Sequence, residues 1–575
     1  MQKLRHTTPA EIAAMTATGT TADDWNEILV AEDFSPSQVA CCRFEGRVEI
    51  GSRARVVDST LSRYRIASDA VVESVGRMEC RRRSSFGNAV RVAAINENGG
   101  RAVAMFDTMS AQTAYIAAVY RHRPDAVQAI ERLVDRYAES RADDMGSVGE
   151  GARISNVKFI REVRIGRGAA IEGASSLECG TVAAGAYVGV DVKASEFIFD
   201  EHSHVGGGAV VERCFVGEAC TLDKGFTAVD SLFFAGSHCE NGEAASIFAG
   251  PYTVSHHKSS LLIAGMFSFF NAGSGSNQSN HLFKSGAVHQ SIHPRGCKFG
   301  SGAYIMSPAI EGAFTVVIGR HSHHHDTHEM PFSYLIESDG GSMLMPAMNL
   351  TSYGTVRDIE KWCKRDRRTL RRDRIDFDEF NPFLTGMMVR GVDRLNSLRD
   401  GDPKADIYRY NRTTIKSTML VRGIKLYNRA IAASIGRMLD NAVPSPDNTG
   451  ADEWIDAAGQ YITRGTADRL LDDLEAGRIT SLEQIDERLQ AFADNYRSYA
   501  CDYALALLSS LLGHRPTPEE IADTVSSSEN IIRSMREQTD ADLRRDCGEE
   551  MSIGYGYDYR DDEVRRADYK NVRGL

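Results

Sequence analysis

Acid–base and amide side chains gather in two neighbouring stretches of the sequence, residues 252–258 and 271–293. The second stretch holds many small residues and few large aliphatic ones, and side chains of this kind rarely fill a core. Acyl transfer from a thioester needs a base, donors for the oxyanion, and polar groups that orient the acceptor. Histidine suits the first role, backbone N–H groups of glycine-rich turns the second, and Asn and Lys the third. We therefore predict a functional pocket here.

Two histidines are candidates for the base, His281 as first choice and His257 as second. The predicted substrate-binding residues are polar or charged and lie in or after the two stretches: Lys258, Asn277, Asn280, Lys284, His289, Tyr252 and Arg320. The nearby Phe267, Phe269 and Phe270 favour a partly buried segment over a free loop.

A second histidine-rich segment, RHSHHHDTHEMPF at residues 320–332, raises the question of a metal site. Histidine and carboxylate ligands at short spacing can bind Zn²⁺ or Ni²⁺. The candidate ligands are His321, His323, His325 and His328. Their spacing is irregular, and the segment follows Ile318–Gly319 and precedes Pro331, which is typical of a turn. We therefore expect no physiological metal here.

Aliphatic residues recur every five or six positions over much of the chain, and glycine follows many of them. The clearest run is Ile154, Ile160, Ile165, Ile171, Leu177, Val182 and Val188. This period fits neither an α-helix nor one strand. It fits coils of three short strands, one per side of a triangular prism, with glycine tolerating positive φ in the turns. The predicted fold is mainly β, a parallel β-helix of hexapeptide repeats.

Three other parts of the chain lack this period and have helical spacing, residues 8–31, 109–141 and about 380–545. The predicted units are a 1–43 N-terminal helical segment, 44–98 first β-helix coils, a 99–148 helical insertion, a 149–354 main β-helix domain with the site, a 355–550 helical C-terminal domain and a 551–575 irregular tail. The basic run at 364–374 is predicted to be a solvated link or a contact between subunits.

Composition limits the classes of partner. The formal net charge of -12 argues against a nucleic-acid partner, which would need a basic face. The longest apolar run, residues 261–270, is about half of the roughly 20 residues that span a bilayer, so no membrane span is expected. The N-terminus is polar and resembles no signal peptide. The 11 cysteines include no CxxC pair and favour reduced thiols, which predicts a cytoplasmic protein.

The repeat resembles that of the left-handed β-helix, hexapeptide-repeat transferase superfamily. Residues 244–286 are also similar to a narrower family of long bacterial proteins, found in gut anaerobes and described as a domain of unknown function. That likeness extends from LRHTTPAEIAAMTATGTTADDW at 4–25 through MPFSYLIE at 330–337 into the helical tail. Most superfamily members are acyltransferases, and others are sugar nucleotidyltransferases or γ-class carbonic anhydrases. They form trimers with active sites in the clefts between subunits.

One local pattern is similar to that of the bifunctional N-acetylglucosamine-1-phosphate acetyltransferases/uridyltransferases. It comprises Gly273-Ser274-Gly275-Ser276-Asn277, Asn280-His281 and Lys284. The Tyr-Asp-Gly triplet of those enzymes is missing, and no nucleotidyltransferase domain precedes the repeat.

The resemblance implies a homotrimer that transfers an acyl group from acyl-CoA, as co-substrate, to a sugar or nucleotide-sugar. One alternative is a protein that binds sugar-phosphates or nucleotide-sugars without acyl transfer, related to nucleotidyltransferases. Another is a metal-dependent lyase or hydrolase of the γ-carbonic-anhydrase type, which would need a divalent metal. A scaffold without turnover is equally compatible with the sequence.

Overall fold

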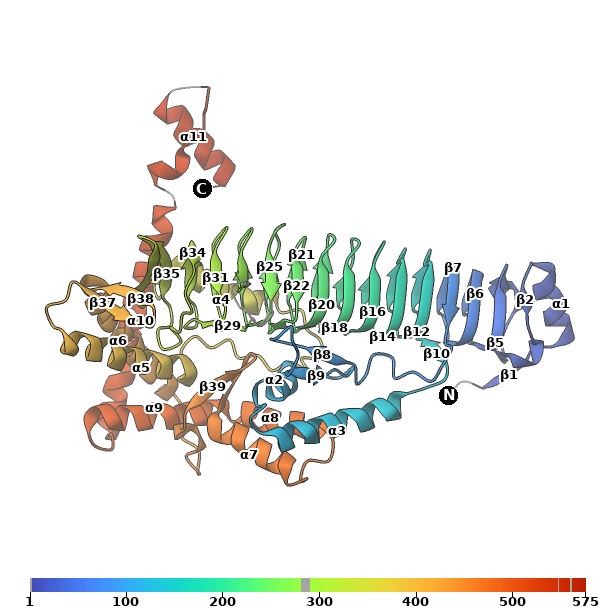
Figure 1. The fold of residues 1–575 in the computed structure, drawn as a ribbon, viewed down its shortest axis with the longest axis horizontal. Helices are drawn as coiled ribbons and strands as arrows, with labels where there is room; N and C mark the ends of the chain where they lie inside the picture. The colour runs from blue at the N-terminus through green and yellow to red at the C-terminus, as the bar shows by residue number, and fades with distance from the viewer. Residues whose placement is uncertain (1–2, 281–289, 547, 559–560, 575) are drawn as a thin grey trace.

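A parallel β-solenoid forms the long axis of the molecule in the computed structural model, which describes residues 3–280, 290–546, 548–558 and 561–574 (Figure 1). The N-terminal elements close one end of the solenoid. Helices of the insertion and some helices of the C-terminal region lie below the solenoid in Figure 1, and other C-terminal helices lie at its far end. The predicted mainly β, parallel solenoid fold is therefore confirmed.

The regular coils are 17 residues long, because Ile171 pairs with Val188, which in turn pairs with Val205. Each regular coil contributes one short strand and one longer strand that bends in its middle. The bend falls on a residue with left-handed backbone, as at Cys179 with φ 54°. The aliphatic residues that the repeat singled out are the buried ones, so the period of five or six residues marks the inward positions.

The parallel strands pair with their equivalents one coil away. Their bounds are β4 (Val39–Ala40), β5 (Arg43–Ile50), β6 (Arg55–Ile66), β7 (Val71–Glu79), β10 (Gly146–Val148), β11 (Arg153–Ser155), β12 (Phe159–Ile165), β13 (Ala170–Glu172), β14 (Ser176–Val182), β15 (Tyr187–Val188), β16 (Lys193–Phe199), β17 (His204–Val205), β18 (Val210–Val216), β19 (Thr221–Asp223), β20 (Thr227–Phe233), β21 (His238–Glu240), β22 (Glu243–Ala245), β23 (Phe248–Ala249), β24 (Val254–Ser255), β25 (Leu261–Ile263), β26 (Gly265–Phe267), β27 (Asn271–Ala272), β28 (Asn277–Ser279), β29 (Ser291–His293), β30 (Lys298–Phe299), β31 (Tyr304–Met306), β32 (Ala309–Ile310), β33 (Val316–Ile318), β34 (Arg320–His321) and β35 (Tyr334–Ser338).

The N-terminal segment is only partly helical, in contrast to the prediction for residues 8–31. Helix α1 (Pro9–Ala17) begins at the capping box of Thr8 and is followed by Gly19 at φ 83°. The chain then continues as strands, because the β-branched Ile28 and Val30 lie inward and extend the solenoid beside β5. The strands of this segment are β1 (Leu4–His6), β2 (Thr21–Ala22) and β3 (Ile28–Ala31).

The insertion interrupts a single coil, since β10 pairs with β6 and so resumes the solenoid after residue 145. It contains the hairpin β8 (Arg91–Ala93) and β9 (Ala102–Ala104), and helices α2 (Ala111–Val119) and α3 (Pro124–Arg141). The outward-facing Ile198, Phe215 and Leu232 are buried in the same apolar cluster as these elements and the C-terminal region. The insertion therefore covers an apolar outer stripe of the solenoid.

The C-terminal region is mainly helical, with two hairpins. Its elements are β36 (Gly341–Met345), α4 (Tyr353–Arg365), α5 (Pro382–Gly401), β37 (Ile407–Tyr410), β38 (Thr413–Lys416), α6 (Ser417–Leu439), β39 (Trp454–Ala457), β40 (Gln460–Thr463), α7 (Arg464–Glu475), α8 (Leu482–Asp494), α9 (Tyr496–Leu512), α10 (Pro518–Arg545) and α11 (Asp562–Arg573). The tail, predicted to be irregular, thus contains α11, which Asp561 caps. Helix α11 stands apart from the body of the molecule in Figure 1.

Residues 366–376, which we call the strap, run from α4 along the outside of the solenoid. The Glu218 carboxylate accepts the N–H groups of Leu370 and Arg371 at 2.7 and 3.0 Å. The two carboxylate oxygens of Asp373 accept the N–H groups of Ala111 and Ala235 at 2.7 and 2.8 Å. The prediction of a solvated link is therefore wrong, because buried carboxylates fasten this basic run to its own chain. A contact between subunits stays a prediction.

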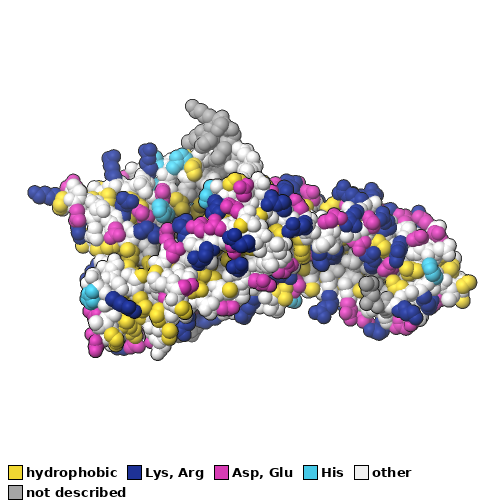
Figure 2. All heavy atoms as spheres, turned by 90° about the horizontal axis from the view of Figure 1, so that it is seen from below, with side chains coloured by type: hydrophobic (Ala, Val, Ile, Leu, Met, Phe, Trp, Pro, Cys, Tyr) yellow, Lys and Arg dark blue, Asp and Glu magenta, His cyan; other side chains and the backbone are white. Residues whose placement is uncertain are grey.

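Charges of both signs are interspersed over the face seen in Figure 2, with no broad field of one sign. Among the helices of the described residues, none is both long and apolar enough to cross a bilayer.

Candidate functional site

The described members of the predicted acyl-transfer pocket do not gather in one place. His281, Lys284 and His289 lie outside the described residues. Asn280 is buried and donates its amide to the carbonyl of Ser307 at 2.7 Å. A buried amide held in this way supports the packing of the coil.

Other members of that set differ in their exposure to solvent. His257 and Lys258 are exposed on the turn that follows β24, whereas Tyr252 is buried with its ring 5.5 Å from that of Phe269. Burial raises the pKa of Tyr252.

Asn277 and Arg320 lie on either side of Tyr304, because the intervening strand β31 pairs with β28 and with β34. The Arg320 guanidinium lies 5.0 Å from the centre of the Tyr304 ring. These two residues therefore lie on one outer face, one on each side of Tyr304.

Part of the polar stretch faces the interior of the solenoid. His293 is fully buried, its Nδ1 lies 2.6 Å from Oε2 of the equally buried Glu311, and its ring stacks on Phe267. Gln278 is also fully buried. The expectation that such side chains do not fill a core is therefore wrong for these two residues.

The histidine-rich segment divides between the interior and the surface. His321 and His325 are buried and both contact the Ser342 hydroxyl, at 2.8 and 2.9 Å. Burial lowers the pKa of His321, and it lowers the pKa of His325 to about 4. His323 is exposed, and the half-buried His328 pairs with Asp326. The four candidate ligands therefore do not form one site.

A different trio has the geometry of a metal centre within the part of the chain that the structure describes. Potential ligand atoms of His238, Glu240 and His256 all lie within 4.8 Å of one another. His238 and Glu240 alternate along β21, so both side chains point outward from the solenoid. Strand β24 pairs with β21 one coil later, and His256 directly follows β24. The fold thus places three ligands from two adjacent coils on one outer face.

The carboxylate of Glu240 is the centre of this trio. Its Oε1 lies 2.9 Å from Nε2 of His238, and its Oε2 lies 3.9 Å from Nδ1 of His256 and 2.6 Å from Nζ of Lys224. Partial burial raises the pKa of Glu240, but the hydrogen bonds from Lys224 and His238 outweigh burial and hold it below its usual value. Burial, and then His238, lower the pKa of His256. An ionised carboxylate and a neutral imidazole are the forms that bind metal.

The trio extends a row of aromatic and acidic side chains on the same face. His204 pairs with Thr221, and Thr221 pairs with His238. The ring of His204 stacks on Tyr187 at 4.7 Å, and its Nε2 lies 3.8 Å from Asp223. Neighbouring coils therefore present further polar groups beside the trio.

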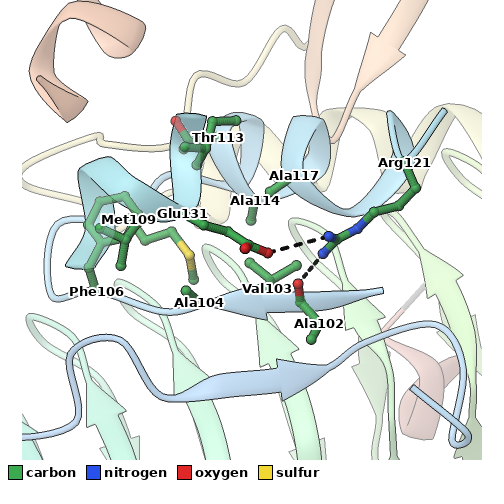
Figure 3. A pocket seen from close by; sticks show the side chains of 12 residues that line it. Ala102, Val103, Ala104, Phe106, Met109, Thr113, Ala114, Ala117, Arg121 and Glu131 are labelled. Carbon is green, nitrogen blue, oxygen red and sulfur yellow. Dashed lines mark hydrogen bonds and ion pairs between the residues drawn. The ribbon is translucent and has the colours of Figure 1, made fainter. Parts of the chain in front are cut away.

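The cavity drawn in Figure 3 does not compete with this site. It has a volume of about 10 Å³, which is close to the minimum for one water molecule. Apolar side chains of β9, α2 and α3 line most of it. Arg121, which bonds to the carbonyl of Ala102 and pairs with Glu131 at 3.5 Å, points across it. This cavity is a packing gap within the insertion.

Sequence reasoning missed His238 and Glu240. The signal was a His-x-Glu alternation, which puts both side chains on one face of a strand, followed about one coil later by His256. That spacing becomes informative only when the coil is known to be 17 residues long.

Comparison with known proteins matches residues 53–399 to a family described as "Domain of unknown function (DUF4954)". Residues 437–575 match a second family, described as "Domain of unknown function (DUF6819)". A relative named "Uncharacterized protein" from Treponema pallidum (strain Nichols) is 22% identical over 605 aligned positions, which cover 87% of this chain and 81% of the relative.

Proposed function

This chain belongs to the DUF4954 family, and we propose that it is a metal-dependent hydrolase or lyase that binds a divalent ion, Zn²⁺ as first choice, at His238, Glu240 and His256. The observation that supports this proposal is the convergence of the three ligand atoms within 4.8 Å from two coils. Two histidines and one carboxylate form the ligand set of several catalytic zinc sites, in which a fourth position holds water or substrate.

A neighbouring side chain holds the turn that carries His256. Asn241 donates its side-chain amide to the carbonyl of His256 at 3.1 Å and so supports the turn that carries this histidine. Glu240 is the least exposed of the three side chains, at 13%. The metal would supply a bound water whose pKa lies near neutrality, and the half-buried ligands leave one side open to a substrate.

Metal binding by the purified, untagged protein tests the proposal. We expect one Zn²⁺ or Co²⁺ per chain by calorimetry and elemental analysis. His256→Ala and Glu240→Gln should each weaken binding by at least the roughly 10–100-fold that follows removal of an outer-shell partner. His204→Ala, in the same row, is the matched control and should bind normally.

A second control removes the exposed His323 and the half-buried His328 of the other segment, His323→Gln with His328→Gln. Binding that disappears in that variant but survives in Glu240→Gln would place the metal elsewhere and contradict the proposal.

Acyl transfer is the second candidate function. It is supported by the exposure of His257 and Lys258 on the turn beside His256, where a base and a cation could meet an acyl-CoA and a sugar or nucleotide-sugar acceptor. A ligand present at about 100 times its dissociation constant would stabilise the fold by about 2.7 kcal/mol. Thermal stabilisation by acetyl-CoA that is lost in His257→Ala would favour this function over the first.

We further propose that the solenoid is the left-handed, triangular prism of the hexapeptide-repeat superfamily and that the chain forms a homotrimer. Support comes from the period of five or six residues and from bends at equivalent positions of successive coils, as at Cys179, Glu196 and Arg213, which are the corners that such a prism needs. Light scattering on the intact protein tests the trimer, since a monomeric mass would exclude it.

A further inference from the structure

A lysine forms an ion pair with the carboxylate that would bind the metal. Nζ of Lys224 lies 2.6 Å from Oε2 of Glu240, the same oxygen that His256 approaches at 3.9 Å. Lys224 comes from the preceding coil, directly after β19, and its backbone N–H donates to the Asp223 carboxylate at 2.7 Å. Its backbone is therefore fixed beside the trio.

The side chain of Lys224 is nevertheless free to move, because 57% of it is exposed to solvent. An ammonium group and a divalent cation a few ångströms apart repel each other. A metal ion that enters the trio must therefore push the ammonium of Lys224 away from Glu240. Glu240 is already held towards the trio in the metal-free chain, where its other oxygen lies 2.9 Å from Nε2 of His238.

We propose that Lys224 and the metal exchange on Glu240, and that the displaced ammonium of Lys224 then binds an anionic substrate, a carboxylate or phosphate, on the metal. This inference rests on the proposed metal site. In the metal-free chain the lysine neutralises the carboxylate of Glu240. Entry of a dication then adds two positive charges without removing the lysine, so the loaded site attracts an anion.

The neighbouring acidic group cancels only part of this charge. With a dication and the Lys224 ammonium set against the carboxylates of Glu240 and Asp223, the loaded site keeps one net positive charge. A metal flanked by an ammonium group is an arrangement that polarises and orients carboxylate or phosphate oxygens.

The test measures Co²⁺ affinity by calorimetry on metal-free, untagged, full-length protein. Lys224→Met should bind Co²⁺ on the order of tenfold more tightly than the wild-type chain, because the competing charge is gone. Lys224→Arg keeps the charge and should bind as the wild type does. Lys193→Met is the matched control, since Lys193 is exposed on the same solenoid, forms no ion pair with a described residue, and should leave the affinity unchanged.

The second step adds inorganic phosphate to the Co²⁺-loaded proteins and follows the visible absorption of the metal. Wild type, Lys224→Arg and Lys193→Met should respond at the same phosphate concentration, and Lys224→Met should need roughly tenfold more.

The outcomes separate the two proposals. Equal Co²⁺ affinity in Lys224→Met and wild type overturns the exchange but leaves the metal site standing. Unchanged phosphate binding in Lys224→Met overturns the role of this lysine towards the anion. Absence of Co²⁺ binding in every protein overturns the metal site and this inference together.

Discussion

Two lengths of the same solenoid have different interiors. The interior is apolar in the first length, the coils of β14 to β18, and partly polar in the second length, the coils of β28 to β34. In one inward row, Leu177 is followed by Ala194 and Val211, all apolar, whereas the later positions of that row include Gln278 and His321. A second row passes from Phe233 through Ala249 and Phe267 to His293 and Glu311. The first length follows the ordinary rule for a core, and the second length breaks it.

The difference shows that the polar coils depend on hydrogen bonds between their buried polar groups and on the C-terminal helices that pack against them. Glu311 pairs with His293, and Ser342 joins two histidines, because a buried polar group without a partner is costly. The pairing is incomplete, since the amide group of Gln278 has no hydrogen-bond partner in the described part of the chain. C-terminal helices pack against the end of these coils, where the Tyr427 hydroxyl of α6 donates to the carbonyl of Pro331 at 2.6 Å.

The largest expected effect comes from breaking the buried pair. Glu311→Ala should lower the free energy of unfolding by about 3–5 kcal/mol, because it leaves His293 buried without its partner. Hydrogen exchange of the peptides that contain β29–β33 measures the loss. Replacing both partners, as in His293→Phe with Glu311→Leu, should cost far less. Glu243→Gln removes an exposed carboxylate and is the control; an equal effect of this variant would show that the Glu311 pair contributes nothing special.

Low pH should destabilise the second length of the solenoid more than the first. The pKa of His325 is lowered to about 4 in the folded chain, whereas the unfolded chain binds this proton near pH 6.5. Stability is therefore lost as pH falls from about 6.5 towards 4, by about 3 kcal/mol in total, and His321 acts in the same direction. Hydrogen exchange, corrected for intrinsic rates, should show the coils around β34 opening before those around β14.

His325→Gln should flatten this pH dependence. His202→Gln, which removes an exposed histidine on the first length, should leave it unchanged. Simultaneous opening of both lengths with acid would refute the assignment to buried histidines.

The smallest expected change in stability is an increase. Gln278→Leu should raise the free energy of unfolding by about 1–3 kcal/mol, because it removes a buried amide that bonds to none of the described residues and keeps a similar volume. The reverse change one coil earlier, Leu262→Gln, should destabilise the same row. Thermal unfolding of both variants compares the signs. A loss in Gln278→Leu would mean that the amide has a partner in the working protein, such as a bound water.

The coils of the solenoid could be predicted from sequence only where their interior is apolar. From Ile154 to Leu222 most inward positions are aliphatic residues, so the period of the coil can be recognised in the sequence. Where Gln278 and His293 take those positions, inward and outward residues have the same chemistry and the period disappears. The strap shows the same limit, since its arginines are visible in sequence but their partners Glu218 and Asp200 lie 153 and 172 residues away.

The candidate site was partly predictable. The sequence pointed to the coil that carries His256 and His257, because histidine and lysine are enriched there. It could not say which histidine meets a carboxylate, since that depends on coil length and register. Glu240 contacts both histidines and Lys224. In the sequence nothing distinguishes it from other surface glutamates, because two of these contacts come from neighbouring coils.

The strap also has a consequence for the order in which the protein is made. Arg371 leaves the ribosome 153 residues after Glu218, the carboxylate that receives its N–H. At a synthesis rate of ~5–20 residues per second, that interval is roughly 8–30 s. Throughout it, the coils that carry Glu218 and Asp200 must hold their shape without the strap, by their apolar interior, their strand pairing and the insertion that precedes them. The apolar length of the solenoid is thus the part that must be stable before the strap is synthesised.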